Sequence, residues 1–482
     1  MLFNSLDFAI FLPVVFLLYW LVTNKNLRLQ NLLIVVASYV FYGWWDWRFL
    51  SLIFFSSVVD YSVGLALHKQ KNEHFRRILL WTSITVNLGF LGFFKYYNFF
   101  LENVESAFSL MGTPIQGSSL HIILPVGISF YTFQTLSYTL DIYKKKLSPT
   151  KDFISFLAFV SFFPQLVAGP IERASHLLPQ FYKKREFEYA KAVDGLRQVL
   201  WGLFKKMVIA DNAAELANLI FNNSSSYSGS TLMLGAVFFA FQIYGDFSGY
   251  SDIAIGTSRL FGFDLMQNFA FPYFSRDIAE FWRRWHISLS TWFRDYLYIP
   301  LGGSRGNILK KVRNTFVVFI VSGFWHGANW TYIVWGTLNA IYFLPLLLFN
   351  INRKNTDVVA EGKIFPTIRE FAGILATFLL STLAWIFFRA ENIDHATKYI
   401  ATIFSKSSLI APNFIGMRHA LVTLALIFLF CIIEWTGREN KFALEKIGLK
   451  WSTPARWVFY LIIAFFIFYF QGDQQEFIYF QF

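Results

Sequence analysis

The sequence predicts an all-α polytopic integral membrane protein, and three observations carry that prediction. Of 482 residues, 55% are hydrophobic and 60 are Phe, which is too apolar for a soluble chain of this length. The apolar residues fall into blocks close to the roughly 20 residues that cross a bilayer as a helix. Strand-like alternation of apolar and polar residues is missing, so a transmembrane barrel is disfavoured.

The apolar blocks predict about 11–12 transmembrane helices. The first block follows no basic segment and precedes no small-residue cleavage site, so we expect a retained span and not a signal peptide. The candidate spans are 8–23, 30–45, 49–67, 78–97, 121–142, 197–220, 230–256, 314–326, 330–349, 370–388, 418–435 and 455–472.

The basic residues between these blocks predict the orientation. The loops 69–77, 144–146 and 310–313 are basic, whereas the opposite side carries 102–119, with no basic residue, and the Ser-rich 222–230. Because Lys and Arg are enriched in cytoplasmic loops, we expect the basic loops to be cytoplasmic and both termini to lie outside. The net charge of +12 fits this bias better than a nucleic-acid partner, and it would also attract an anionic donor.

Two segments are not expected to be simple spans. The apolar stretch 153–169 has basic segments on both sides and ends in Phe163-Pro-Gln-Leu-Val-Ala-Gly-Pro170, whose prolines stop regular helix. A re-entrant or half-spanning segment fits this pattern. The stretch 266–306 mixes aromatic residues with five arginines, which predicts short amphipathic helices near the cytoplasmic surface. No repeat or linker marks a boundary, so we expect one membrane-embedded domain over 1–482.

Two histidines inside aromatic and polar motifs are the main candidates for chemistry. The first, His326, lies in Ser322-Gly-Phe-Trp-His-Gly-Ala-Asn-Trp330, where Gly323 and Gly327 bracket it. Small residues at this spacing let helices or a substrate approach closely. An imidazole acts as a general base near neutral pH, so His326 is a candidate base. The alternative is a histidine that only joins helices by a hydrogen bond.

The second histidine, His286, lies in Phe281-Trp-Arg-Arg-Trp-His-Ile-Ser-Leu-Ser290. On a continuous helix it shares a face with Trp282 one turn earlier and with the serine that ends the motif. The guanidinium groups of Arg283 and Arg284 suit phosphate, and the aromatic rings suit an adenine or an acyl group. The alternative is a belt of Trp and Arg that anchors the segment at the membrane surface.

A third cluster, Tyr244-Gly-Asp-Phe-Ser-Gly-Tyr-Ser-Asp252, ends an apolar helix. Asp246 and Asp252 do not share a helical face, so a metal-binding or general-acid pair is not indicated. A structural polar network is favoured, since Ser248 and both carboxylates need partners at membrane depth. No metal is expected, and Cys431 is the only cysteine, so no Cys-based metal site is available. No Walker loop, nucleophile elbow or HExxH helix is present, so hydrolysis by a standard serine or zinc apparatus is unsupported.

Taken together, these motifs resemble the membrane-bound O-acyltransferase (MBOAT) family. The matching residues are 246–252, 281–303 and 323–330, within a specific match over about 121–345. The opening segment 8–20, with its Phe-Leu-Pro, leans toward the bacterial branch that O-acetylates alginate and cell-wall polymers. The resemblance implies the MBOAT fold and a tunnel inside the membrane that leads to a buried histidine.

In that family the buried histidine maps onto His326. A second histidine position maps onto His286, and Asn339 stands where many relatives carry another histidine. We interpret His326 as the catalytic base and His286 as part of the cytoplasmic donor-side wall, two stations on one acyl path. The residues expected to bind donor or substrate are Trp282, Arg283, Arg284, Trp325, Asn329, Asp246 and Ser248.

The activity implied by the resemblance is transfer of an acetyl group from a cytoplasmic thioester, most simply acetyl-CoA, to a hydroxyl on the outer side. His326 would take the hydroxyl proton, and Asn329 or Trp325 would hydrogen-bond the developing oxyanion. The acceptor would be an exported or cell-wall polysaccharide, reached through an extracytoplasmic SGNH-type acetyltransferase partner. The protein itself is expected in the bacterial cytoplasmic (inner) membrane. We expect no tightly bound cofactor and no nucleic-acid partner. Membrane lipids are expected to surround the protein.

Two alternatives stay open from the sequence. D-alanyl transfer to teichoic acid from a carrier-protein thioester belongs to the same enzyme class. A polytopic transporter or flippase belongs to another class, since broken helices and a midplane histidine would also serve a transport path.

Overall fold

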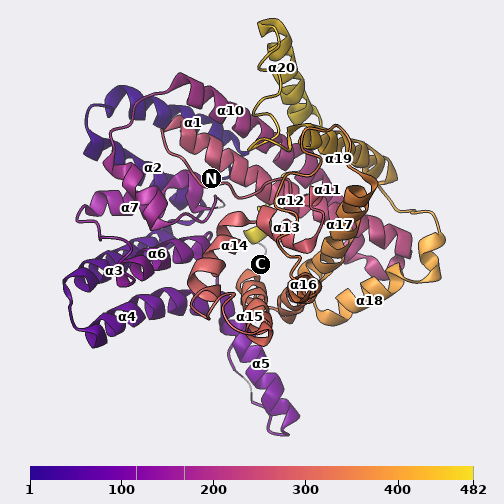
Figure 1. The fold of residues 1–482 in the computed structure, drawn as a ribbon, viewed down its shortest axis with the longest axis horizontal. Coiled ribbons are helices and arrows are strands. Elements are labelled where there is room, and N and C mark those ends of the chain that lie inside the picture. The colour runs from indigo at the N-terminus through magenta and orange to yellow at the C-terminus, as the bar shows by residue number, and fades with distance from the viewer. Residues whose placement is uncertain (116, 168, 481–482) are drawn as a thin grey trace. The chain divides into compact units, whose positions relative to one another are not determined.

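The protein is helical throughout the part of the chain that its computed structural model describes, residues 1–115, 117–167 and 169–480, where no β-strand occurs (Figure 1). This confirms the all-α prediction. The helices form two compact units, one of residues 1–195 and 254–266 and the other of residues 196–253 and 267–482. A single domain over 1–482 stays a prediction.

The first unit holds the N-terminal helices. Helix α1 continues as a π-helical turn over Leu18–Val22, and the side chains of Asn26, Asn72 and Asp152 cap α2, α4 and α7. The helices are α1 (Leu6–Leu17), α2 (Leu27–Asp46), α3 (Leu50–Lys69), α4 (Glu73–Leu91), α5 (Tyr97–Leu110), α6 (Ile128–Tyr143), α7 (Phe153–Ser161), α8 (Phe163–Leu166) and α9 (Ala174–Leu177).

The second unit holds the helices that carry the sequence motifs. Helices α10 (Tyr189–Leu203) and α12 (Gly229–Leu260) cross the division between the units. The others are α11 (Asp211–Asn222), α13 (Ile278–Arg284), α14 (Ile287–Phe293), α15 (Ile308–His326), α16 (Trp330–Leu348), α17 (Ile368–Arg389), α18 (Ile393–Ile403), α19 (Met417–Gly437) and α20 (Thr453–Tyr469).

Each predicted span overlaps a helix, and the protein is a multi-pass membrane protein. Within the described residues, six helical stretches are long and apolar enough to cross a membrane: Leu27–Lys69, Glu73–Leu110, Gly229–Leu260, Trp330–Leu348, Ile368–Arg389 and Met417–Gly437. Leu6–Val22, Phe153–Leu166 and Thr453–Tyr469 are apolar but shorter. The block 121–142 becomes helical only at Ile128, after Gly127 in a left-handed conformation.

The predicted interruption at 153–169 is present. Helix α7 has nine residues and α8 has four, and the chain turns between them at Phe162, two residues before Pro164. Ala168 lies outside the described residues. Neither short helix is long enough to cross a bilayer alone, which fits a segment that spans only part of the membrane.

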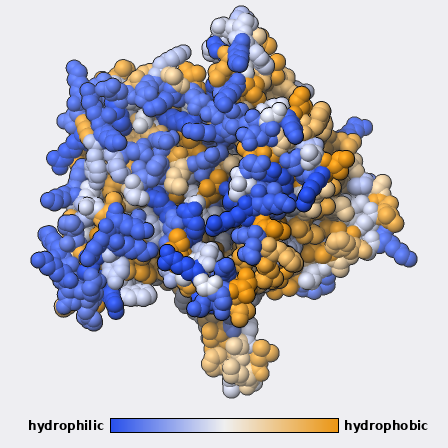
Figure 2. Space-filling view, viewed as in Figure 1, coloured by the Kyte–Doolittle hydropathy of each residue, from blue (hydrophilic) through white to orange (hydrophobic). Residues whose placement is uncertain are grey.

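Apolar side chains also cover the outside of several helices. Leu6 on α1, Leu110 on α5 and Phe468 on α20 are each at least 75% exposed. Figure 2 shows the apolar surface of α5 at the lower edge of the view. Large exposed apolar patches are unusual on soluble monomers, whereas in a membrane protein they contact lipid.

Helices α15 and α16 pack closely because two glycines face one another. A methyl group on Gly336 would lie 3.4 Å from the Cα atom of Gly323 and against the carbonyl oxygen of Phe319. This confirms that the small residues before His326 permit close helix approach.

We therefore expect Gly336→Ala to lower the free energy of unfolding by about 1–3 kcal/mol, because the new methyl group overpacks this contact. Thermal unfolding in detergent micelles measures the change. Gly89→Ala in α4 is the matched control, since a methyl group there meets no atom within 4 Å. Equal melting temperatures for the two variants would contradict the close α15–α16 contact.

Candidate active site

His326 is the last residue of α15. Gly327 follows in extended backbone, and α16 begins three residues later with Asn329 as its cap. The side chain of His326 is 4% exposed. Its ring lies edge-on to Trp335 at 5.2 Å and to Phe388 at 5.4 Å between ring centroids. These apolar rings wall the imidazole and keep water from its faces.

His286 lies beside His326, with 6.4 Å between the two ring centroids. It is 3% exposed and packs edge-on against Phe247 at 4.6 Å. Burial and the neighbouring His326 lower the pKa of His286 well below its ordinary value, so this imidazole is neutral at physiological pH. The expectation that His286 lies in a segment at the membrane surface is therefore wrong, whereas its part in the donor-side wall stays a prediction. Both rings belong to one buried cluster.

The chain breaks its helix at His286. This residue has a left-handed backbone, with φ of 44°, between α13 and α14. The prediction of one continuous helix is wrong here, and Trp282 and Ser290 do not share a helical face with His286. The indole nitrogen of Trp282 instead donates to the side-chain oxygen of Asn339 at 3.3 Å. Its ring lies 5.7 Å from Trp335, the residue that walls His326.

The C-terminal segment completes the cluster, which the sequence motifs did not reveal. The Tyr479 ring lies 5.6 Å from the His326 ring and 6.5 Å from the His286 ring, between centroids. The backbone N–H of Ile478 donates to the Asp246 carboxylate at 2.7 Å, which fastens this segment to α12. A tyrosine so far along the chain from either histidine carries no local signal of this contact.

Asp246 belongs to a buried ion-pair network, which agrees with the structural polar network predicted for this cluster from the sequence. The Lys206 ammonium lies 2.8 Å from both Asp246 and Asp211, and it donates to the carbonyl oxygen of Gln475 at 3.0 Å. Donor binding by Asp246 stays a prediction. Ser248, on the same helix, is also buried.

A second buried network holds Asp252. Lys205 lies 3.0 Å from both Asp252 and Glu434, and the Tyr244 hydroxyl donates to Glu434 at 2.5 Å. Asp252 stood out in the sequence, whereas its partners Lys205 and Glu434 were not predicted. Two adjacent lysines inside the apolar block 197–220, and a glutamate inside the block 418–435, were the available signals, because charges at membrane depth need partners.

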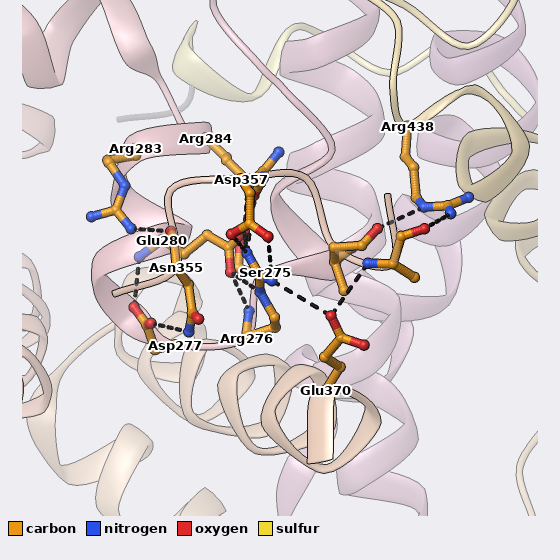
Figure 3. A network of polar contacts seen from close by, with 12 residues as sticks. Ser275, Arg276, Asp277, Glu280, Arg283, Arg284, Asn355, Asp357, Glu370 and Arg438 are labelled. Atoms are coloured by element: carbon orange, nitrogen blue, oxygen red, sulfur yellow. Dashed lines mark hydrogen bonds and ion pairs between the residues drawn. The ribbon is translucent and has the colours of Figure 1, made fainter. Parts of the chain in front are cut away.

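The two arginines of the His286 motif hold the loop after α16 (Figure 3). Arg284 pairs with Glu280 at 2.9 Å and donates to the carbonyl oxygen of Asp357. Arg283 donates to the carbonyl oxygens of Asn352 and Asn355, at 2.9 and 2.6 Å. Both guanidinium groups are thus engaged within the protein, and their role in donor binding stays a prediction.

Arg276 extends the same network. It contacts Glu280 at 3.0 Å and Asp357 at 2.9 Å, and it lies 3.5 Å from Glu370. The hydrogen bonds from Arg276 hold the pKa of Asp357 below its ordinary value. A cavity of about 710 Å³ lies beside this network, and Lys354, Lys363 and Arg369 are among its lining residues.

We expect Arg276→Ala to loosen the loop 350–362, because hydrogen bonds to charged groups contribute about 1.5 kcal/mol or more. Hydrogen–deuterium exchange of that loop should become about tenfold faster. Because the pKa of Asp357 is lowered, its pairing with Arg276 acts at neutral pH and is lost as the pH falls through that lowered pKa. Arg353→Ala, an exposed change in the same loop, should leave exchange unaltered; equal rates in the two variants would contradict this role.

The remaining predicted residues flank the cluster. The Asn329 side chain caps α16 by accepting from the Thr331 N–H at 3.0 Å, and its nitrogen donates to the carbonyl oxygen of Glu391 at 2.8 Å. Both ends of this amide are therefore used in structure. Trp325 is half-buried, directly before His326.

Comparison with known protein families identifies the class of this helical membrane protein with two buried histidines. The model of the MBOAT, membrane-bound O-acyltransferase family, matches residues 79–358. The chain therefore belongs to the membrane-bound O-acyltransferase family, and it is an O-acyltransferase. The resemblance seen in the sequence is confirmed, and the alternative of a transporter or flippase is wrong.

Three individual relatives show how far along the chain the similarity to each kind of enzyme extends. The chain is 40% identical to the probable alginate O-acetylase AlgI of Pseudomonas aeruginosa, over 89% of this chain and 81% of that protein. It is 35% identical to the peptidoglycan O-acetyltransferase of Helicobacter pylori, over 100% and 98%. It is 31% identical to the teichoic acid D-alanyltransferase of Streptococcus thermophilus, over 45% and 55%. The similarity to the two O-acetylating enzymes thus extends over most of the chain.

Proposed function

We propose that this protein transfers an acetyl group from a cytoplasmic thioester, most simply acetyl-CoA, to a hydroxyl on the outer side of the membrane. The observation that carries the proposal is the buried pair His326–His286, 6.4 Å apart between ring centroids, in a chain whose full-length relatives are O-acetyltransferases. The acceptor is an exported or cell-wall polysaccharide. An extracytoplasmic SGNH-type acetyltransferase is the partner that passes the acetyl group on to it.

In this proposal, His326 is the general base. It takes the proton of the acceptor hydroxyl while the oxygen attacks the thioester carbonyl carbon. The tetrahedral intermediate then collapses: the C–S bond breaks, the thiolate leaves, and the imidazolium returns the proton to it. A thiolate is a good leaving group, so proton removal and orientation by the aromatic walls supply most of the acceleration.

The oxyanion and the donor phosphates need separate partners. Both ends of the Asn329 amide are engaged, so Asn329 would have to give up one of these bonds to stabilise the oxyanion; the Trp325 indole is the other candidate donor. Since Arg283 and Arg284 hold the loop after α16, we place the donor phosphates in the cavity beside them. Lys354 and Lys363, on the loop that is expected to be cytoplasmic, and Arg369, at the start of α17, supply cations there, beside the carboxylates that also line the cavity.

We also propose that the protein lies in the bacterial cytoplasmic membrane with both termini outside, as the basic loops predict. Alkaline phosphatase fused to the C-terminus should be active, and the same enzyme fused after Lys311 should be inactive. The reverse pattern would overturn this orientation.

Purified protein in nanodiscs with labelled acetyl-CoA tests the proposed reaction. We expect thiol release, and transfer of label to a polysaccharide hydroxyl when the SGNH-type partner and the polysaccharide are both present. A D-alanyl carrier-protein thioester is the control donor, because one relative is a teichoic acid D-alanyltransferase. Turnover of the D-alanyl thioester without turnover of acetyl-CoA would overturn the proposal.

A further inference from the structure

The side chain of Asn268 connects three elements around His286. It lies between α12 and α13 and is fully buried. Its oxygen lies 3.0 Å from Nδ1 of His286 and accepts from the Ser288 hydroxyl at 2.8 Å. Its nitrogen donates to the hydroxyl oxygen of Ser251, on α12, at 3.0 Å. Every polar end of this amide therefore has a partner.

The contacts determine which end of the Asn268 amide faces His286. The backbone N–H of Ser288 also points at the Asn268 side-chain atom that faces His286, at 3.4 Å. A backbone N–H only donates, so the atom facing it is the oxygen and not the nitrogen. The same oxygen faces Nδ1 of His286, so Nδ1 carries the proton. In a neutral imidazole Nε2 then holds the lone pair.

The backbone holds this geometry in place. The Ile287 N–H donates to the carbonyl oxygen of Asn268 at 2.9 Å, and the Ala270 N–H donates to that of Arg284 at 3.0 Å. These two bonds flank the left-handed backbone of His286. Such a conformation in a residue other than glycine persists only when its surroundings enforce it, and it gathers at functional sites.

We propose that Asn268 is a positioning residue that holds His286 in the Nδ1–H tautomer, leaving Nε2 as the proton acceptor of that ring. The inference rests on the proposed function only in assuming that His286 takes part in acyl transfer. The titratable groups that face His286 are His326 at the end of α15 and Tyr479 in the C-terminal segment. The tautomer decides which nitrogen of the His286 ring can accept a hydrogen bond or a proton in the site.

The tautomer is measured directly by ¹⁵N NMR of histidine-labelled protein in lipid, with His286→Asn used to assign the signal. We expect a protonated Nδ1 and an unprotonated Nε2 for His286 in the wild-type protein. A protonated Nε2 would overturn the proposal. This readout needs no acyl transfer, so it stands whether or not the proposed reaction is found.

Two variants then connect the tautomer to the reaction. Asn268→Leu removes the acceptor, and we expect kcat to fall about 10- to 100-fold with KM for the donor unchanged. Asn268→Asp keeps an acceptor but adds a negative charge, so it should keep the tautomer and move the acid limb of the pH–rate profile upward by about one unit or more. Asn223→Asp, the same change at an exposed position at the end of α11, is the matched control and should keep the wild-type profile. Wild-type kcat and pH profile in both Asn268 variants would overturn the positioning role, even if Asn268→Leu folds poorly, because Asn268→Asp preserves size and shape.

Discussion

His326→Gln should abolish most acyl transfer, with kcat falling by about 10²- to 10⁴-fold, the range that a positioned acid–base group contributes. Glutamine is close to histidine in size, so the walls formed by Trp335 and Phe388 stay in place. It has no basic nitrogen at neutral pH, however, and the acceptor hydroxyl keeps its proton. Labelled acetyl-CoA turnover in nanodiscs measures the loss.

The control for this change is His68→Gln, since His68 is exposed near the end of α3. It should retain wild-type turnover. The melting temperature of both variants shows whether the protein is folded during the assay. Folded His326→Gln protein that turns over acetyl-CoA at the wild-type rate would rule out His326 as the base.

Lys206→Met should destabilise the protein more than any surface change, by about 3–5 kcal/mol in the free energy of unfolding. The substitution leaves Asp211 and Asp246 buried without the ammonium that lies 2.8 Å from each. It also removes the hydrogen bond to the Gln475 carbonyl, so the segment that carries Tyr479 loses an attachment. The melting temperature in detergent and the rate of acyl turnover should both fall.

Two comparisons isolate the buried charges as the cause. Adding Asp211→Asn and Asp246→Asn to Lys206→Met removes the uncompensated carboxylates and should restore a large part of the stability. Lys398→Met breaks an exposed pair with Asp394, whose side chains are 76% and 70% exposed, and should cost no more than about 1 kcal/mol. A Lys206→Met protein as stable as Lys398→Met would contradict the importance of this network.

The helices were readable from the sequence because each apolar block had to satisfy its own backbone inside a membrane. Length and apolarity therefore located helices as far apart as α2 and α19. The same reasoning missed α5 and α18 as separate helices. In α5, no residue is buried against the described part of the chain, so a pattern of inward-facing residues is not visible there.

The two histidines were readable from their motifs, but their proximity was not. Their neighbours come from α12, α17 and the C-terminal segment, and the bend at His286 depends on backbone hydrogen bonds to Asn268 and Ala270. Tertiary contacts of this kind leave no periodic trace in a sequence.

The ion pairs of Arg276 and Arg284 with Glu280 were not predicted, although their spacing can be read from the sequence. Composition suggested phosphate ligands, yet Glu280 stands four residues after Arg276 and four before Arg284. That i,i+4 spacing brings opposite charges together on one side of the chain. It was present in the sequence and, given more weight, predicts an internal ion-pair network.

The left-handed backbone at His286, with φ of 44°, decides how mutagenesis of this residue should be interpreted. Asparagine tolerates such a conformation better than most residues, whereas alanine and branched side chains resist it. Loss of activity in an alanine scan would therefore mix backbone strain with loss of the imidazole. His286→Asn separates the two, so a survey that tries only alanine assigns to chemistry part of an effect that belongs to chain geometry.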